Sequence, residues 1–98
     1  MITRNGDNLQ LAGPLTLKTV KALFDQGLQA GGRSRLAVDM SQVEAVDSAA
    51  VSLMLAWLRE AQRTNVTICF SNIPDNLMSL ARLYGVADML PLCANAAA

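Results

Sequence analysis

The sequence predicts a mixed α/β domain, a small β-sheet packed by helices, with its elements in the order β-β-α-β-α-β-α. Alternating or β-rich short runs mark the strands, and three longer segments carry apolar residues at helical spacing. Helices separate the last three strands, so we expect these strands to be parallel and joined by crossover connections. The first two strands are close enough in sequence to form an antiparallel hairpin.

The first two predicted strands flank a turn signal. Residues 2–4 predict a short strand, and the Asn-Gly-Asp sequence at 5–7 predicts a turn, because Asn and Gly tolerate positive φ. In residues 8–12, leucines alternate with polar residues, which is typical of a half-buried strand. The Gly-Pro pair at 13–14 is expected to end this strand.

The first predicted helix begins at Thr16, which is a favoured N-cap residue. The glycine pair at 31–32 is expected to end it, because glycine accepts the left-handed conformation at a C-cap. The apolar stripe of this helix consists of Val20, Leu23, Phe24, Gly27 and Leu28.

The middle of the chain predicts a buried strand followed by the second helix. Residues 36–40 form a nearly continuous apolar run, which is typical of a central strand, and a polar turn is expected after it. The second helix is predicted from residue 48 to about residue 63. Residues 66–70 are rich in β-formers and predict the next strand.

The third helix is predicted to begin at Pro74, because proline suits the first helical turn. Gly85 is expected to cap it, residues 86–92 predict a last short element, and the alanine-rich tail at 94–98 is expected to fray. The apolar stripe of this helix consists of Leu77, Leu80, Ala81 and Tyr84.

Length and composition limit the classes of protein to consider. A chain of 98 residues predicts a single domain over 1–98, and 52% hydrophobic residues favour a folded core over disorder. Eight basic residues balance eight acidic residues without a block of like charge, so we expect no nucleic-acid binding. No apolar run approaches the ~20 residues that a membrane span needs, so we expect no direct membrane insertion.

The two cysteines, Cys69 and Cys93, lie far apart in the sequence, and nothing in the sequence forces them to pair. The first residues do not have the pattern of a secretory signal. We therefore expect a reducing, cytoplasmic setting.

The residue types of a catalytic site are largely missing. Without histidine, neither a Ser-His-Asp nor a Cys-His constellation can form, and two distant cysteines make a poor zinc site. No glycine-rich phosphate-binding loop is present. Asp39, Glu44 and Asp47 are close in sequence, and we interpret them as solvated turn acids. We expect no enzyme activity, no metal and no cofactor.

The start of the second helix is the candidate site. Ser48 is predicted as its N-cap, a role worth typically ~1 kcal/mol, and Asp47 is favourable near the positive end of the helix. Ala49 and Ala50 are small, so they would leave the helix start accessible to another chain. We predict that this helix start binds a partner protein.

The rest of the second helix has more apolar residues than one stripe requires. If Val51, Leu55 and Leu58 form the core face, Leu53 and Trp57 point away from it. Either neighbouring helices bury these two residues or a partner covers them. Because tryptophan is enriched at interface hot spots, we include Leu53 and Trp57 in the predicted partner-binding surface.

Ser48 is also a candidate phosphorylation site. A phosphate would add about −1.5 to −2 charges, which a helix N-terminus tolerates and a docked apolar or acidic partner does not. Phosphorylation of Ser48 would therefore act as a switch on such a contact.

The sequence Asp39-Met40-Ser41-x-Val43-x-x-Val46-Asp47-Ser48-x-x-Val51 resembles the signature of STAS domains. The resemblance extends from Leu9 to about Leu92 and implies the STAS fold. Many STAS domains carry glycine where this chain has Ala50, and the extra methyl group disfavours a kinase-regulated role more than simple docking.

Within the family, residues 80–86 and the Leu-Pro pair at 90–91 are most similar to the small STAS subunits of phospholipid-transporting ABC systems. This similarity implies a cytoplasmic subunit that is peripheral to the inner membrane and supports outer-membrane lipid asymmetry. It implies that Ser48 contacts the transporter ATPase, which is in complex with a membrane permease. The alternative is an anti-sigma-factor antagonist switched by phosphorylation of Ser48. A small-ligand-binding STAS domain is a third, weaker interpretation.

Overall fold

The structure is a computed structural model that describes residues 2–28 and 34–93. The predicted glycine pair at 31–32 and the predicted tail at 94–98 lie outside the described residues. The elements are β1 (Ile2–Asn5), β2 (Asn8–Leu15), α1 (Leu17–Gln26), β3 (Arg35–Val46), α2 (Ser48–Arg63), β4 (Thr67–Ser71), α3 (Asp75–Leu83) and a short 3-10 helix η1 (Ala87–Met89).

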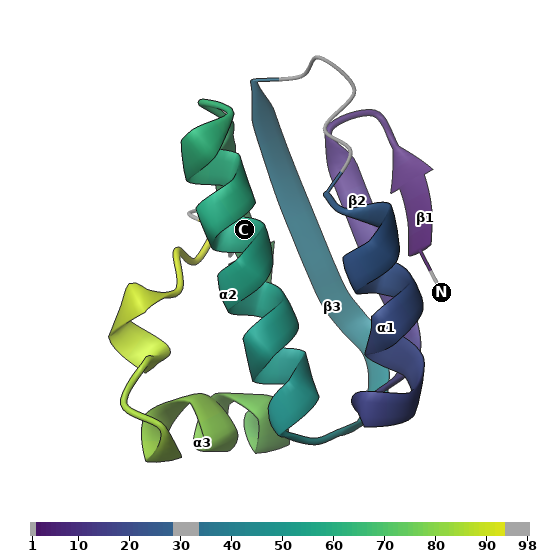
Figure 1. The fold of residues 1–98 in the computed structure, drawn as a ribbon, viewed down its shortest axis with the longest axis vertical. Helices are drawn as coiled ribbons and strands as arrows, with labels where there is room; N and C mark the ends of the chain where they lie inside the picture. The colour runs from purple at the N-terminus through teal and green to yellow at the C-terminus, as the bar shows by residue number, and fades with distance from the viewer. Residues whose placement is uncertain (1, 29–33, 94–98) are drawn as a thin grey trace.

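The predicted α/β topology is confirmed. The four strands form one sheet in the order β1-β2-β3-β4, in which β1 and β2 pair antiparallel. The pairs β2–β3 and β3–β4 are parallel, as expected for strands joined through helices. Figure 1 shows α1 and α2 side by side against the sheet, with α3 crossing near the first turns of α2. The helix start that the sequence singled out therefore lies where several elements meet.

The core lies between the sheet and the helices. In the first part of β2 and β3 and in β4, every second residue is buried, because successive side chains of a strand point to opposite faces. The strands bury Leu9, Leu11, Leu15, Leu36, Val38, Met40, Val43, Ile68 and Phe70. The helices bury Val20, Leu23, Ala50, Val51, Leu53, Met54, Trp57, Ala61, Leu77 and Ala81 against them.

The Gly-Pro pair at 13–14 does not end the second strand, contrary to the prediction. β2 continues to Leu15, with irregular register between Gln10 and Ala12 and between Gly13 and Leu15. Among the residues that the structure describes, β1 pairs with β2 only up to Leu11, and no other described strand lies on that side of β2 beyond it. No backbone N–H donor is needed on such a free side. Pro14, which lacks an N–H, therefore fits within the strand.

The turn predicted after residue 40 is also wrong. β3 continues to Val46, because its second half pairs with β2 at Ala12↔Gln42, Gly13↔Val43 and Leu15↔Val46. The exposed residues that look like a turn in the sequence are the solvent-facing positions of a strand. This extension carries the chain directly to Asp47, next to the start of α1.

The ends of α1 and α3 are formed by the predicted residue types, glycine and proline, at shifted positions. α1 ends at Gln26, and Gly27 caps it with φ 69°, earlier than the expected glycine pair. Pro74 is the residue before α3, one position earlier than predicted, and Gly85 follows the helix with φ 73°. None of the helices in the described part of the chain is long and apolar enough to cross a membrane.

Candidate functional site between the first turns of two helices

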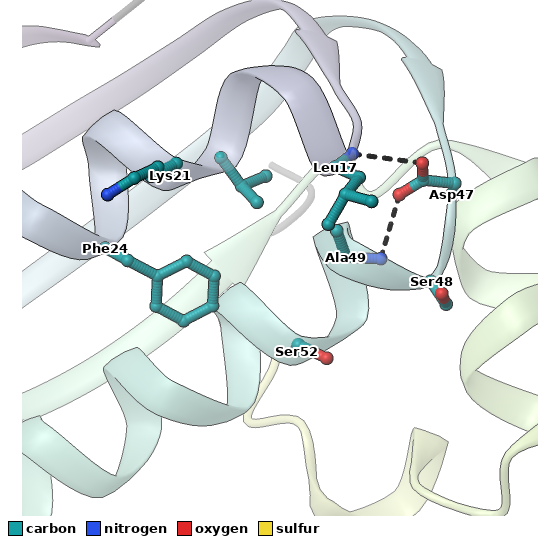
Figure 2. Close-up of a pocket in the computed structure, with 8 residues that line it drawn as sticks. Leu17, Lys21, Phe24, Asp47, Ser48, Ala49 and Ser52 are labelled. Atoms are coloured by element: carbon teal, nitrogen blue, oxygen red, sulfur yellow. Dashed lines mark hydrogen bonds between the residues drawn. The ribbon is translucent and has the colours of Figure 1, made fainter.

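Asp47 joins the N-termini of α1 and α2. Its Oδ1 accepts a hydrogen bond from the Ala49 backbone N–H at 2.9 Å, which makes Asp47 the N-cap of α2. Its Oδ2 accepts a hydrogen bond from the Leu17 backbone N–H at 3.0 Å, in the first turn of α1 (Figure 2). Both oxygens thus satisfy helix-terminal donors, and the negative charge lies at the positive ends of two helices.

The prediction that Ser48 caps α2 is therefore wrong by one residue. Ser48 is the first residue of the helix, and its side chain is exposed beside Asp47. A carboxylate with two oxygens can accept from two helices at once, which one serine oxygen placed inside the helix cannot do. The exposed Ser48 hydroxyl is consequently available for contact or modification.

A surface groove of about 510 Å³ lies between α1 and α2 next to this cap. Figure 2 shows the Phe24 ring between the two helices, with Leu17 at the Asp47 end. Leu17 is 75% exposed and Phe24 is 41% exposed, although both are large and apolar. The lining residues are Leu17, Val20, Lys21 and Phe24 from α1, and Asp47, Ser48, Ala49 and Ser52 from the start of α2. The groove therefore presents apolar side chains to solvent beside the exposed Ser48 hydroxyl.

The sequence analysis missed the contribution of α1 to this groove. It placed Phe24 in the buried stripe, but the side chain lies at the surface. Leu17, Val20, Lys21 and Phe24 have the spacing i, i+3, i+4, i+7, so they share one face of the helix. That spacing was the available signal for a second, partly exposed face of α1.

Three of the predicted partner-binding residues lie in the core instead. Ala50, Leu53 and Trp57 are 0%, 1% and 2% exposed, so their assignment to a contact surface is corrected. α2 contacts α1, α3 and β4, and these neighbours cover the side of the helix that carries Ala50, Leu53 and Trp57. Leu55 and Leu58, which were expected on the core face, are only half-buried. The predicted stripe was thus rotated about the helix axis relative to the observed one.

A second carboxylate fixes the other end of α1. Both oxygens of Glu60, in the fourth turn of α2, lie 3.2 Å from the Leu28 backbone nitrogen and accept its hydrogen. The Leu28 carbonyl accepts a hydrogen bond from the Arg4 guanidinium at 2.8 Å. α1 is thereby held against α2 at both ends, and the groove lies between the two fixed points.

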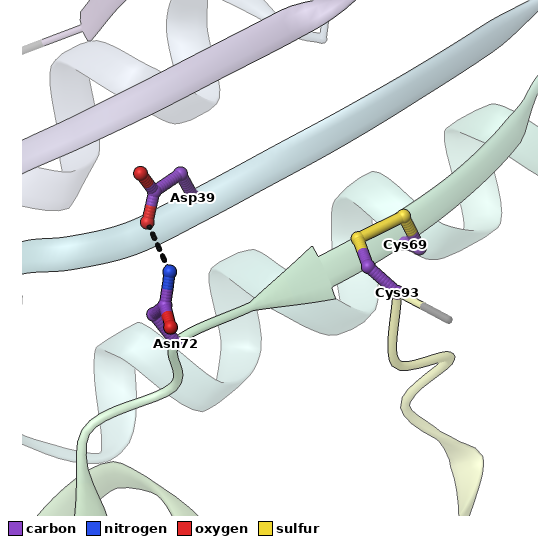
Figure 3. The surroundings of a disulfide bond; sticks show 4 residues. All are labelled: Asp39, Cys69, Asn72 and Cys93. Carbon is purple, nitrogen blue, oxygen red and sulfur yellow. Dashed lines mark hydrogen bonds between the residues drawn. A yellow bond between two sulfur atoms is a disulfide. The ribbon is translucent and has the colours of Figure 1, made fainter. Parts of the chain in front are cut away.

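The opposite face of the sheet carries a polar group around Asp39. The Ser41 backbone N–H donates to Asp39 Oδ1 at 2.9 Å. The Asn72 side-chain amide donates to the same oxygen at 3.1 Å (Figure 3). Partial burial acts to raise the pKa of Asp39, but these hydrogen bonds to the charged form outweigh it, so the pKa lies below its ordinary value. Asp39 thus has a structural role in joining β3 to the residue that follows β4.

The structure pairs Cys69 with Cys93 in a disulfide, which the sequence alone did not require. Cys69 lies on β4 and Cys93 lies in the segment after η1 (Figure 3). In the described parts of the chain, no three His, Cys, Asp or Glu side chains are grouped so that they could hold a metal ion. The groove therefore offers apolar and polar surface, and its carboxylate, Asp47, accepts hydrogen bonds from backbone N–H groups.

Comparison with known proteins identifies the family. The family model described as "Mlab, STAS domain" matches residues 1–91, so the chain belongs to the STAS domain family. Among curated proteins it is similar to the intermembrane phospholipid transport system binding protein MlaB of Haemophilus influenzae, with 28% identity over 96 residues and coverage of 91% of each chain. Among solved structures it is similar to the anti-sigma factor antagonist SpoIIAA in its unphosphorylated form. That match has a TM-score of 0.73 and 14% identity, and it covers 97% of this chain and 88% of the other, which shows a shared fold.

Proposed function

We propose that the protein is a non-catalytic STAS subunit that binds and supports the ATPase of an ABC transporter for phospholipids. The name of its MlaB relative, an intermembrane phospholipid transport system binding protein, supports this function. The partner would be an ATPase of the MlaF kind in complex with a membrane permease. The protein would then act in the cytoplasm, peripheral to the inner membrane, and contribute to outer-membrane lipid asymmetry.

The observation that carries the proposal is the apolar groove beside an exposed Ser48. Leu17 and Phe24 present apolar surface to solvent. The small side chain of Ala49 leaves room for a partner to approach the first turn of α2 closely. Exposed apolar side chains around a small concave surface are typical of protein contact sites. We propose Ser48, Ala49, Leu17 and Phe24 as contact residues.

Asp47 supports this surface from below. Because both of its oxygens are bound to backbone N–H groups, it positions the first turns of α1 and α2 rather than binding the partner. Ala50, Leu53 and Trp57 fill the core beneath α2 and keep the helix in place. Their proposed role is to shape the contact surface.

The groove favours binding over catalysis. Its acid, Asp47, is committed to two hydrogen bonds, and its cation, Lys21, forms an exposed ion pair with Asp25 at 3.1 Å. Among the described residues, the groove lining contains no second acid, histidine or cysteine that could act with Asp47 as an acid–base pair. The transporter ATPase would supply the nucleotide chemistry, and this chain would supply the docking surface.

An anti-sigma-factor antagonist type of regulator is the second candidate function. The observation that favours it is the exposed Ser48 hydroxyl in the first turn of α2, where a kinase could reach it. A phosphate there would stand beside the Asp47 carboxylate and at the mouth of the groove. The added negative charge would oppose docking of an apolar or acidic partner.

The test is a pull-down of the tagged full-length protein from its native cells, with partners identified by mass spectrometry. The proposal expects the wild type to retain a P-loop ATPase and its permease, and Ser48→Glu to retain at least tenfold less of both. Ser79→Glu is the matched control, because Ser79 is exposed on α3, away from the groove. Equal recovery with Ser48→Glu would remove Ser48 from the contact.

A phosphate-affinity gel separates the two candidate functions. The transporter subunit needs no modification, so the protein from cells should run as one band. A kinase-like regulator in the pull-down, together with a shifted band that Ser48→Ala abolishes, would establish the regulatory function instead.

A further inference from the structure

The segment after η1 covers the outer edge of β4. β4 is an edge strand of the sheet, and Leu92 forms a parallel bridge to Phe70. The Phe70 N–H donates to the Pro91 carbonyl at 2.8 Å, and the Cys93 N–H donates to the Phe70 carbonyl at 2.9 Å. This short segment thus satisfies outward-facing backbone groups that an edge strand would otherwise leave open to another chain.

The Cys69–Cys93 disulfide fastens that segment at the same place. Cys69 precedes Phe70 in β4, and Cys93 follows Leu92, so the covalent bond lies directly beside the two hydrogen bonds. The bond closes a loop with a sequence separation of 24 residues, which contains α3 and η1. This loop carries the exposed apolar side chains Leu83, Tyr84, Met89 and Leu92.

We propose that Cys69–Cys93 is a thiol–disulfide exchange site that fastens the segment 91–93 to the edge of β4 and releases it on reduction by a dithiol. Both cysteines are half-buried, so neither is sealed inside the core. Leu90, just before the segment, is buried and remains as an anchor. Release is therefore confined to the last described residues and leaves the core intact.

The exchange follows ordinary thiol chemistry. A thiolate of the dithiol attacks one cysteine sulfur, the S–S bond breaks, and a mixed disulfide forms while the other cysteine leaves as a thiolate. The second thiol of the reductant then displaces the first cysteine and closes the reductant's own disulfide. Two electrons and two protons pass to the protein, which gains two cysteine thiols.

Reduction leaves the segment paired with β4 through the two backbone hydrogen bonds that form the Phe70–Leu92 bridge. A segment that is held at the edge of a sheet by only a few hydrogen bonds opens easily. The disulfide limits how far the segment can move, because it closes the loop covalently. The Phe70 N–H and C=O then become available for pairing with another strand. The inference does not depend on the proposed docking at the α1–α2 groove, which lies on other elements.

Amide hydrogen exchange on the full-length protein tests this, with oxidised protein compared with protein in dithiothreitol. We expect the Phe70 and Cys93 amides to exchange at least tenfold faster after reduction, while the Val38 amide in the central strand keeps its rate. Cys93→Ser should show the fast rate without reductant and should not respond to dithiothreitol. Thiol titration confirms the redox state of each sample.

Three results would overturn the proposal. One is an unchanged exchange rate of the Phe70 amide in a sample with two titrated thiols, since the disulfide would then have no effect on the edge of β4. Another is faster exchange of Val38 to the same degree, which would mean that the disulfide supports the whole fold. The third is two free thiols in protein that has been left under air without reductant.

Discussion

The first turn of α2 lines an open groove and the third turn buries its tryptophan, although the residue types of the two turns suggest the reverse. The start of α2 has small residues, and Ser48 and Ala49 of the first turn line the open groove together with Ser52 of the second. The third turn carries Trp57, the residue type most often found at interface hot spots, and Trp57 is 2% exposed. The comparison teaches that surface is assigned by the neighbours of a helix, here α1, α3 and β4, rather than by its most apolar residues.

The largest expected effect is at the closed turn. Trp57→Ala should lower the free energy of unfolding by ~3–5 kcal/mol, because it removes a large buried side chain and leaves a cavity. Chemical denaturation followed by circular dichroism measures this loss. A stable Trp57→Ala protein that had lost only its partner would show instead that Trp57 belongs to the contact surface.

Trp57→Phe is the matched control for that substitution. Among residues 2–28 and 34–93, the Trp57 indole Nε1 has no hydrogen-bond partner. Phenylalanine keeps most of the ring and removes a buried unpaired donor, whose cost is about 1–3 kcal/mol. We therefore expect Trp57→Phe to lose less than half as much stability as Trp57→Ala.

The next effect is at the junction between the two helices. Asp47→Ala should cost about 1–2 kcal/mol of unfolding free energy, because the Ala49 and Leu17 N–H groups both lose their acceptor. Ser48→Ala, by contrast, should change stability by less than about 0.5 kcal/mol, because the exposed Ser48 does not cap the helix. Equal losses from the two alanine variants would restore Ser48 as the cap.

At the far end of α1 the expected loss is smaller. Glu60→Ala removes the acceptor for the Leu28 N–H, and we expect a loss of about 1 kcal/mol in thermal or denaturant unfolding. Glu44→Ala is the control, because Glu44 is an exposed carboxylate on β3. If the two variants lose the same stability, Glu60 does not hold α1.

Asp39 gives a pH-dependent effect on the other face of the sheet. Its folded pKa is lowered, so its contribution to stability is present above the unfolded value of about 3.9 and is lost as the pH falls through the folded pKa. Asp39→Asn should therefore cost less than Asp47→Ala at pH 7, and its difference from wild type should shrink below pH 4. Denaturation at pH 7, 5 and 3 measures this, and a constant difference would contradict it.

Local patterns in the sequence were sufficient for the strands, the helices and their parallel connections. They failed where a distant segment decides the outcome. β3 runs through its exposed residues because β2 pairs with them. Asp47, the N-cap of α2, also accepts a hydrogen bond from the Leu17 N–H of α1, which is 30 residues away in sequence. The disulfide depends on the return of the chain from η1 to β4, and no local spacing reports that return.

The buried face of α2 was predicted wrongly for a different physical reason. A helix covered on several sides has apolar residues around much of its circumference, so more than one stripe fits the same sequence. α1 shows the complementary case. Leu17 and Phe24 share a face of this helix, and α2 lies beside that face without covering it. The spacing in α1 can indicate such a face, but it cannot show that α2 lies beside it and completes the groove.

The smallest effect on stability should accompany the clearest effect on binding, at the open end of the helix pair. Leu17 and Leu83 are both leucines that are 75% exposed, but only Leu17 lines the groove. Replacing either by alanine should change the free energy of unfolding by less than about 0.5 kcal/mol, as for most surface substitutions. In the pull-down, Leu17→Ala should retain several-fold less ATPase than wild type, whereas Leu83→Ala should retain as much as wild type. The reverse pattern would move the contact surface from the groove to the end of α3, because these variants differ in position and not in residue type or exposure.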